Sequence, residues 1–154
     1  MSKITYEEEE LDLELANELM PLLELHRQEL SAYQDMKLNV DVYGYITMYN
    51  MGMYKCFIAR NESQHVVGYL CYTIARNMHY NDYTIGIQDV LYVDKSARGA
   101  MIGSRLIAFS DDIMKNKYGV NVVSQHVKTK HDMESIMKRN GYTWIEKIYS
   151  KRLN

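Results

Sequence analysis

Residues that staple or interrupt a fold are scarce in this sequence. Its 154 residues include two cysteines, Cys56 and Cys71, and one proline, Pro21. Two cysteines are too few for a disulfide framework, and neither cysteine nor histidine recurs at the spacing of zinc ligands. We therefore interpret both cysteines as buried free thiols. We expect no bound metal and a reducing, cytoplasmic location.

Long apolar runs are missing as well. No run reaches the length of about 18 apolar residues that a membrane-spanning helix needs. The N-terminal segment, with its four consecutive glutamates, lacks the basic start and apolar stretch of a secretory signal. A Gly-x-Ser-x-Gly motif is absent too, so a serine hydrolase is unsupported. Without internal repeats, linkers or low-complexity stretches, the sequence predicts a single domain over residues 1–154 and no membrane partner.

The net charge of −2 conceals two halves of opposite sign. Residues 1–94 contain 6 Lys and Arg against 15 Asp and Glu, a net of −9, whereas residues 95–154 contain 12 against 5, a net of +7. A basic half can hold an anionic ligand and an acidic half can attract a cationic one, although a mixed solvated surface would give the same counts. Because general nucleic-acid binders are usually strongly basic, nucleic acid is not the expected partner.

Apolar periodicity predicts a mixed α/β fold. A helical stripe that begins at Leu11 continues past Pro21, which should kink this helix or start a new one, and Asp41 is a suitable N-cap for the next helix. Cys56 and Cys71 should face each other across a hairpin. The expected strands are residues 3–7, 54–60, 65–75, 84–93, 121–127 and 142–151, and the expected helices are residues 11–30, 42–50, 102–117 and 132–140. The order is therefore β-α-α-β-β-β-α-β-α-β.

Arg98, Gly99 and Gly103 lie between an expected buried strand and the first turn of an amphipathic helix. The first turn of a helix has N–H groups without intrahelical partners, at the positive end of the helix dipole. Glycine lets a phosphate approach such a backbone closely, and Arg98 would add a charge-assisted contact. These residues fit a phosphate site, but they also fit a purely structural glycine-rich turn.

Two segments around this turn resemble a known family. Residues 88–93 read Gln-Asp-Val-Leu-Tyr-Val, and residues 97–106 read Ala-Arg-Gly-Ala-Met-Ile-Gly-Ser-Arg-Leu. Together they resemble the acetyl-CoA-binding segment of the GNAT acyltransferase superfamily, in which an apolar strand ending in valine precedes Arg-Gly-x-Gly-x-Gly/Ala and a helix. Residues 140–142, Asn-Gly-Tyr, are similar to the Gly-Phe/Tyr pair after the superfamily's penultimate helix. Residues 79–80, 126–129, 131–132 and 149–153 also resemble the small GNAT proteins that bacteriophages and prophages often encode.

The resemblance implies the GNAT fold, with acetyl-CoA as cosubstrate. It implies that the main chain of Leu91, Tyr92 and Val93 pairs with the pantetheine arm, and that an N–H near Tyr92 or Val93 stabilises the oxyanion. The turn that would hold the pyrophosphate comprises Arg98, Gly99, Ala100, Met101, Ile102, Gly103 and Ser104. Met101 replaces the central glycine of the motif, so its N–H survives but its side chain must point away from the ligand.

The implied reaction, acetyl transfer to an amine, needs a base because a primary amine is mostly protonated at neutral pH. Asp89, four residues before Val93, matches the position where many superfamily members carry a glutamate base. Its apolar neighbours on an expected buried strand would place it in a partly dry environment. Pairing with a nearby cation or capping of a loop would explain Asp89 equally well.

The acid that protonates the departing thiolate is harder to assign. Many superfamily members carry a tyrosine where this chain has Met137, which cannot donate a proton. Tyr142 is the candidate we carry forward, with Tyr80 and Tyr149 as alternatives, and the thiolate can also leave unprotonated. His131 is a third catalytic candidate, because it follows the strand that should separate from the Asp89 strand where the acetyl group lies. A surface role for His131 stays open.

The predicted function is that of an acetyl-CoA-dependent N-acetyltransferase in the cytoplasm, the host cytoplasm if a phage encodes it. Its acceptor would be a primary amine of a small molecule, such as a polyamine or an aminoglycoside-like compound, or of a protein lysine. The acidic first half favours a cationic acceptor. Two alternatives stay open: a non-catalytic GNAT-fold binding module, which Met101 and Met137 favour, and an acyltransferase that modifies nucleic acid. A homodimer is also left open.

Overall fold

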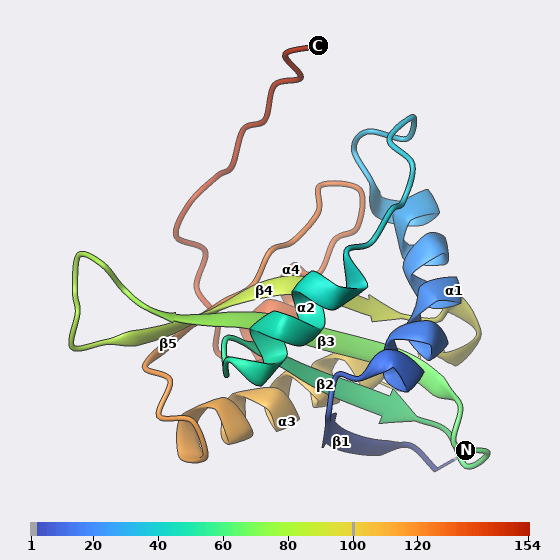
Figure 1. The fold of residues 1–154 in the computed structure, drawn as a ribbon, viewed down its shortest axis with the longest axis horizontal. Coiled ribbons are helices and arrows are strands. Elements are labelled where there is room, and N and C mark those ends of the chain that lie inside the picture. The colour runs from blue at the N-terminus through green and yellow to red at the C-terminus, as the bar shows by residue number, and fades with distance from the viewer. Residues whose placement is uncertain (1–2, 100) are drawn as a thin grey trace.

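The computed structural model describes residues 3–99 and 101–154, and its centre is a five-stranded sheet. The strands are β1 (Thr5–Glu9), β2 (Tyr54–Arg60), β3 (Val66–Arg76), β4 (Thr84–Val93) and β5 (Val122–Ser124). They lie side by side in chain order, antiparallel from β1 to β4, and β5 then runs parallel to β4 (Figure 1). The expected mixed α/β class is therefore confirmed.

Helices cover both faces of this sheet. One face carries α1 (Leu13–Leu30) and α2 (Val42–Asn50), and the other carries α3 (Ile102–Asn116), the crossover from β4 to β5, together with the short α4 (Glu134–Arg139) (Figure 1). Because strand side chains alternate between faces, each face of the sheet contributes to its own apolar core. Among residues 3–99 and 101–154, no helix has both the length and the apolar character to cross a membrane.

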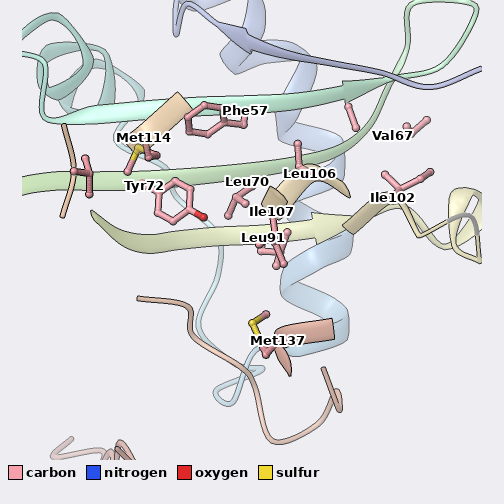
Figure 2. Close-up of a cluster of buried hydrophobic side chains, with 12 residues drawn as sticks. Phe57, Val67, Leu70, Tyr72, Leu91, Ile102, Leu106, Ile107, Met114 and Met137 are labelled. Atoms are coloured by element: carbon pink, nitrogen blue, oxygen red, sulfur yellow. The ribbon is translucent and has the colours of Figure 1, made fainter. Parts of the chain in front are cut away.

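The two cores follow the alternation along β2 and β3. Phe57 and Tyr72 point toward α3 and join Leu106 and Met114 in the cluster of Figure 2. Their neighbours in sequence point toward α1 and α2, where they form a second cluster whose members are Leu11, Leu15, Ala16, Leu19, Tyr54, Cys56, Ile58, Val66, Tyr69, Cys71 and Tyr92. Each helix layer is thus held to the sheet by a separate apolar interface.

Aspartate side chains cap α1 and α2, and of these two caps the sequence predicts Asp41. Asp12 caps α1 by accepting a hydrogen bond from the Leu15 N–H at 2.8 Å, and Asp41 caps α2 by accepting one from the Gly44 N–H at 2.9 Å. Pro21 does not start a new helix, because α1 continues through it as one element. Its ring lies on the exposed side of the helix.

The predicted hairpin of β2 and β3 is confirmed, and the pairing of β3 with β4 contains a bulge. Cys56 pairs with Cys71 across β2 and β3, and both are buried free cysteines. Further along, Cys71 pairs with Val90 while Tyr72 pairs with Gln88, so Asp89 has no partner residue opposite it. A bulge of this kind re-aims a side chain and bends the strand. Asp89 therefore lies at a break in the ladder.

The predicted last strand is wrong. The structure describes residues 142–154 and assigns them neither helix nor strand, and this C-terminal tail extends away from the sheet (Figure 1). β5 is also shorter than expected, with three residues. A strand pattern forms a strand only where a neighbouring edge accepts its backbone hydrogen bonds. The tail lies beside no strand of the described chain.

Candidate functional site

The sheet opens where β5 ends. The β4–β5 ladder stops at the pair Ile87 and Ser124, while β4 continues to Val93. No strand of the described chain covers that side of β4 beyond Ile87. The exposed edge is therefore available to a ligand with its own hydrogen-bonding groups.

Leu91 and Val93 direct their backbone groups to this open edge. The Asp94 N–H donates to the Val67 carbonyl of β3 at 2.8 Å. Backbone groups alternate between the two edges of a strand, so the N–H and C=O of Tyr92 also face β3 and those of Leu91 and Val93 face away from it. The Tyr92 side chain is buried in the cluster under α1. The backbone and side chain of Tyr92 are therefore both directed into the fold, whereas the backbone groups of Leu91 and Val93 face the open edge.

Gln88 bridges the opening at its narrow end. Its side-chain oxygen accepts a hydrogen bond from the His126 N–H at 2.8 Å, and the side chain is buried. This contact ties the loop after β5 to β4 just beyond the last ladder pair. Gln88 is not among the site residues that the sequence predicts. A buried amide in a strand is the signal that would have found it, since such a group needs a specific partner.

A cavity of about 230 Å³ lies on the α1 side of this opening. It brings together two predicted catalytic residues, Asp89 from the bulge and His131 from the loop after β5. Tyr142 is not among the residues that line it. The lining consists of Leu23, His26, Arg27 and Leu30 from α1, Ser31 and Leu38 from the α1–α2 loop, Gln88, Asp89, Val90 and Leu91 from β4, and His126, Lys128, His131 and Met133 beyond β5.

Asp89 is held by a buried tyrosine. The Tyr54 hydroxyl donates a hydrogen bond to Asp89 Oδ2 at 2.7 Å, and burial raises the pKa of Tyr54, so this hydroxyl keeps its proton. Burial, followed by the charge of Asp89, raises the pKa of the nearby Tyr45 to about 12. The expected burial of Asp89 is wrong, because the bulge leaves its side chain exposed. No ion pair to Asp89 occurs within the described residues, so pairing with a cation does not explain it.

His26 is a site residue that sequence reasoning missed. Its ring stacks on Tyr92 with centroids 5.1 Å apart, and its Nδ1 lies 2.9 Å from the Tyr69 hydroxyl. Burial, with a smaller contribution from the charge of Lys128, lowers the pKa of His26 to about 4, so the ring is neutral at pH 7. Tyr69 is fully buried, and in the described chain its hydroxyl has no other partner. It must donate to Nδ1 to be satisfied, which assigns the ring proton to Nε2.

Tyr142 lies on the opposite side of the sheet from Asp89. Its hydroxyl donates to Asp111 of α3 at 2.7 Å and accepts from Gln125 at 3.2 Å. Its ring packs against the core under α3, and burial raises its pKa. The sheet separates it from the Asp89 cavity, so the structure does not support Tyr142 as a catalytic acid. Met137 is buried in the same core (Figure 2).

Arg98 has a different partner from the one expected. Its guanidinium forms two hydrogen bonds with Glu29 of α1, at 2.7 and 2.9 Å, and its Nε donates to the Val93 carbonyl at 3.0 Å. The Arg98 hydrogen bonds lower the pKa of Glu29. This arginine therefore joins α1 to the end of β4 and follows the short 3-10 turn η1 (Lys95–Ala97). Its side chain is committed to these contacts rather than to a phosphate.

The start of α3 presents backbone amides without a side-chain cap. Gly99 and Met101 have positive φ values of 104° and 58°, which turn the chain sharply into the helix. Within the described residues, no side chain accepts a hydrogen bond from the N–H groups of Ile102, Gly103 or Ser104. Ala100, part of the predicted turn, lies outside the described residues. The uncapped amides and the helix dipole together fit an anionic ligand.

Part of the acidic first half of the chain forms ion pairs within the described residues. The cavity lining in the described chain contains one carboxylate, Asp89, against two cations, Arg27 and Lys128. Arg27 is itself paired, with Glu24. The acidic residues used in pairs are Glu8 with Lys117, Glu9 and Glu18 with Arg60, Glu24 with Arg27, Glu29 with Arg98 and Lys95, and Asp35 with Arg152. These ion pairs use six of the fifteen carboxylates in residues 1–94, and the cavity itself is not acidic.

The geometry has a counterpart in a known family. The family model described as "Acetyltransferase (GNAT) family" matches residues 12–142. The chain belongs to the GNAT family. No curated protein matches it. In the described part of this GNAT protein, no group of three or more His, Cys, Asp or Glu side chains is placed to hold a metal ion.

Solved structures share the GNAT fold at low sequence identity. An aminoglycoside acetyltransferase from an uncultured soil metagenomic sample, in complex with sisomicin, is 17% identical with a TM-score of 0.77, covering 98% of this chain and 95% of that one. Glucosamine-6-phosphate N-acetyltransferase from Arabidopsis thaliana is 15% identical with a TM-score of 0.74, covering 97% and 99%. An acetyltransferase from Clostridium acetobutylicum, with acetyl-CoA, is 12% identical with a TM-score of 0.65, covering 98% and 97%.

Proposed function

We propose that this GNAT protein is an acetyl-CoA-dependent N-acetyltransferase, which moves the acetyl group to a primary amine by direct attack on the thioester. The observation that carries the proposal is the open edge of β4. It lies between the uncapped start of α3 and the cavity that contains Asp89. Two substrates can therefore meet at β4 from different sides of the sheet.

The residues present fit a CoA thioester. The amide-containing pantetheine arm would pair with the open edge through the N–H and C=O of Leu91, which leaves the N–H of Val93 free. The diphosphate would accept hydrogen bonds from the N–H groups of Ile102, Gly103 and Ser104, assisted by the helix dipole. The Val93 carbonyl accepts from Arg98. Arg98 would therefore act by ordering the turn, without touching the phosphates.

The chain's own groups can move the proton that the reaction releases. Asp89, oriented by the Tyr54 hydroxyl, would take a proton from the acceptor ammonium, directly or through one water. The amine nitrogen then forms a bond to the thioester carbon, and the carbonyl oxygen becomes an oxyanion. The Val93 N–H is the oxyanion donor we favour, because the Tyr92 N–H faces β3. As the C–S bond breaks, the sulfur leaves as a thiolate, and the nitrogen gives up its second proton to bulk water, which leaves a neutral amide.

The remaining cavity residues bear on the acceptor. His131 and Lys128 line the cavity from the loop after β5, and we assign them to contacts with the acceptor rather than to acid catalysis. A thiol pKa of about 8.5 allows the thiolate to leave without an enzymatic acid. With one carboxylate beside these basic groups, the site suits a primary amine better than a polycation. Acceptors with one amine, of a small molecule or of a protein lysine, are therefore the first to test.

The proposal is tested by CoA-thiol release with a panel of amines and the Asp89→Asn variant. We expect wild-type turnover with at least one amine, and a decrease in kcat of about 10²- to 10⁴-fold in Asp89→Asn, with unchanged CoA affinity, since the amide cannot accept the proton. The exposed Asp82→Asn, in the β3–β4 loop, is the matched control.

Two outcomes would contradict this scheme. Full activity of Asp89→Asn would remove Asp89 from the role of base. Tight CoA binding together with silence toward every amine would favour the non-catalytic binding module.

A further inference from the structure

The cavity that contains Asp89 is small and partly apolar. Its volume of about 230 Å³ is below the range of about 300–1,000 Å³ that is typical of sites for drug-sized ligands. The apolar side chains of its lining are Leu23, Leu30, Leu38, Val90, Leu91 and Met133. Such walls suit a small acceptor with an aliphatic part. Selectivity among small amines then depends on the few polar groups of the cavity.

The loop after β5 brings basic residues to this cavity. The His131 N–H donates to the Lys128 carbonyl at 3.0 Å, which closes a turn and keeps the two residues close together. Within this turn, Lys130 Nζ donates to the carbonyl of Ser31, the C-cap of α1, at 2.8 Å. The turn is therefore anchored to the end of α1 by a residue outside the lining, while Lys128 and His131 line the cavity.

Lys128 is the cation of the lining that is available to a ligand. In the part of the chain that the structure describes, no carboxylate pairs with its ammonium group. The other cation, Arg27, is engaged, since its guanidinium binds Glu24 at 2.7 Å and donates to two backbone carbonyls of the α1–α2 loop. The cavity thus offers a ligand one positive charge, on Lys128, and one negative charge, on Asp89.

His26 adds a neutral hydrogen-bond donor beside these two charges. After burial, the charge of Lys128 is the next influence that lowers the pKa of His26, and the charges of Glu29 and Asp89 act in the opposite direction. The ring therefore lies close to both Lys128 and Asp89. Its Nδ1 accepts from Tyr69, and within the described residues its Nε2–H has no acceptor. An oxygen of a ligand in the cavity can take this hydrogen bond.

We propose that the cavity binds a small amino acid as the acceptor, with its ammonium group at Asp89 and its carboxylate at Lys128 and His26. One carboxylate oxygen accepts from the Lys128 ammonium group and the other accepts from the imidazole Nε2–H. The two charges of such an acceptor match the two charges of the cavity. This inference rests on the proposed acetyl transfer, because it names the acceptor of that reaction.

Other amines match the cavity less well. The second ammonium group of a polyamine would face Lys128, and this contact between like charges disfavours it. A protein lysine has no carboxylate at a fixed distance from its ε-ammonium group, so Lys128 and His26 would have no part in binding it. The phosphate of an amino-alkyl phosphate would bring about two negative charges to one lysine.

The test measures CoA-thiol release with matched pairs of acceptors: glycine and glycinamide, β-alanine and β-alaninamide, and leucine and leucinamide. The members of a pair have nearly the same size, and the amide lacks the negative charge. We expect kcat/KM for one or more of the amino acids to exceed that for its amide by about 10- to 100-fold, as for a hydrogen bond to a charged group. In Lys128→Gln this ratio should fall about tenfold. Lys37, an exposed lysine of the α1–α2 loop outside the cavity lining, provides the matched control Lys37→Gln, which should keep the wild-type ratio.

Calorimetric titration of the CoA-bound protein with the same compounds separates this inference from the proposed acetyl transfer, because CoA carries no acetyl group to transfer. We expect the preference for the amino acid over its amide to appear in Kd as well, and to fall in Lys128→Gln. This preference without turnover of any amine would contradict acetyl transfer and would support the recognition of amino acids.

Three results would overturn the inference. Turnover of amines with equal kcat/KM for amino acids and amides would do so while leaving acetyl transfer in place. A wild-type preference that persists in Lys128→Gln would mean that another group recognises the carboxylate. Phosphoethanolamine, the phosphate probe, should be a poorer acceptor than β-alanine, and a higher kcat/KM for phosphoethanolamine would show that the cavity selects a phosphate.

Discussion

At the scale of single residues, the site combines an exposed carboxylate with a neutral histidine. Asp89 stays accessible because the bulge turns it out of the ladder, and Tyr54 fixes one of its oxygens. His26 faces the same cavity, with Nδ1 held by the Tyr69 hydroxyl and its ring stacked on Tyr92. A neutral ring beside the acceptor position can donate a hydrogen bond from Nε2 without repelling an ammonium group.

The buried His26 should make the protein sensitive to acid. Its pKa falls from 6.5 to about 4 on folding, so the unfolded chain binds more protons between these values. The contribution of neutral His26 to the free energy of unfolding is therefore complete above pH 6.5 and is lost as the pH falls toward 4. It amounts to at most about 3 kcal/mol. In His26→Gln, we expect the free energy of unfolding to change much less with pH than in the wild type. Urea unfolding between pH 7 and pH 4.5 measures this slope. The exposed His65→Gln is the control and should keep the wild-type slope, and a His26→Gln slope equal to wild type would contradict the burial argument.

The sequence could reveal some of these residues and not others. Asp89 and His131 were found through the resemblance to the GNAT superfamily, and the structure brings both to one cavity. His26 continues the α1 stripe of Leu15, Leu19 and Leu22, which makes a histidine on an apolar face its visible signal. Neither its tautomer nor the commitment of Arg98 to Glu29 can be deduced from spacing, because both depend on contacts between distant segments.

At the scale of elements, α3 begins with a strained backbone and has no side-chain cap. Met101 adopts φ of 58° and ψ of 23°, a left-handed conformation that favours glycine. This is the position where the family motif has glycine. The turn keeps its amides free for a ligand, and the methionine side chain, 47% exposed, adds little burial in return.

Replacing this methionine should stabilise the protein. In Met101→Gly, relief of the left-handed conformation, about 1–2 kcal/mol, exceeds the greater flexibility that glycine adds to the unfolded chain, so we expect a gain of about 0.5–1 kcal/mol in the free energy of unfolding. Urea unfolding measures it. Met51, an exposed methionine at the end of α2 with φ of −79°, provides the control, and Met51→Gly should lose stability. Equal losses in both variants would show that Met101 is not strained.

Element boundaries were predictable wherever local signals decide them. The Asp41 cap, the hairpin and the bounds of β4 all follow from short-range patterns. The last strand was not predictable in this way, because residues 142–151 have strand composition but their pairing depends on an edge that no local signal identifies. The bulge at Asp89 likewise depends on the register between β3 and β4.

At the scale of the whole molecule, the sheet separates the cavity proposed for the acceptor from the α3 amides proposed for the cosubstrate. On one face, α1 and the α1–α2 loop border the cavity for the acceptor together with Asp89, while α3 on the other face supplies uncapped amides. The early end of β5 leaves β4 open between them. The ion pair between Arg98 and Glu29 joins the two layers around the end of β4, so binding at the α3 turn is mechanically linked to the position of α1.

This arrangement predicts that a substitution of Gly103, at the start of α3, can prevent cosubstrate binding while the protein still folds. A Cβ added at Gly103 would meet Val93 Cγ2 at 3.6 Å, an ordinary contact, so Gly103→Ala should fold and bind normally. A phenylalanine would extend further, across the first-turn amides. At a CoA concentration 100-fold above Kd, binding stabilises the wild type by about 2.7 kcal/mol. That corresponds to a Tm increase of about 5–10 °C for a domain of this size.

In Gly103→Phe we expect this increase to vanish while the Tm of the free protein stays close to that of Gly103→Ala, measured by calorimetry with and without CoA. The alanine variant separates loss of the glycine itself from obstruction of the amides. If the phenylalanine variant kept the full increase, the diphosphate would have to bind away from α3. The open edge of β4 would then lack the anchor that aligns a thioester with Asp89, and the separation of the two substrates by the sheet would no longer explain how they meet.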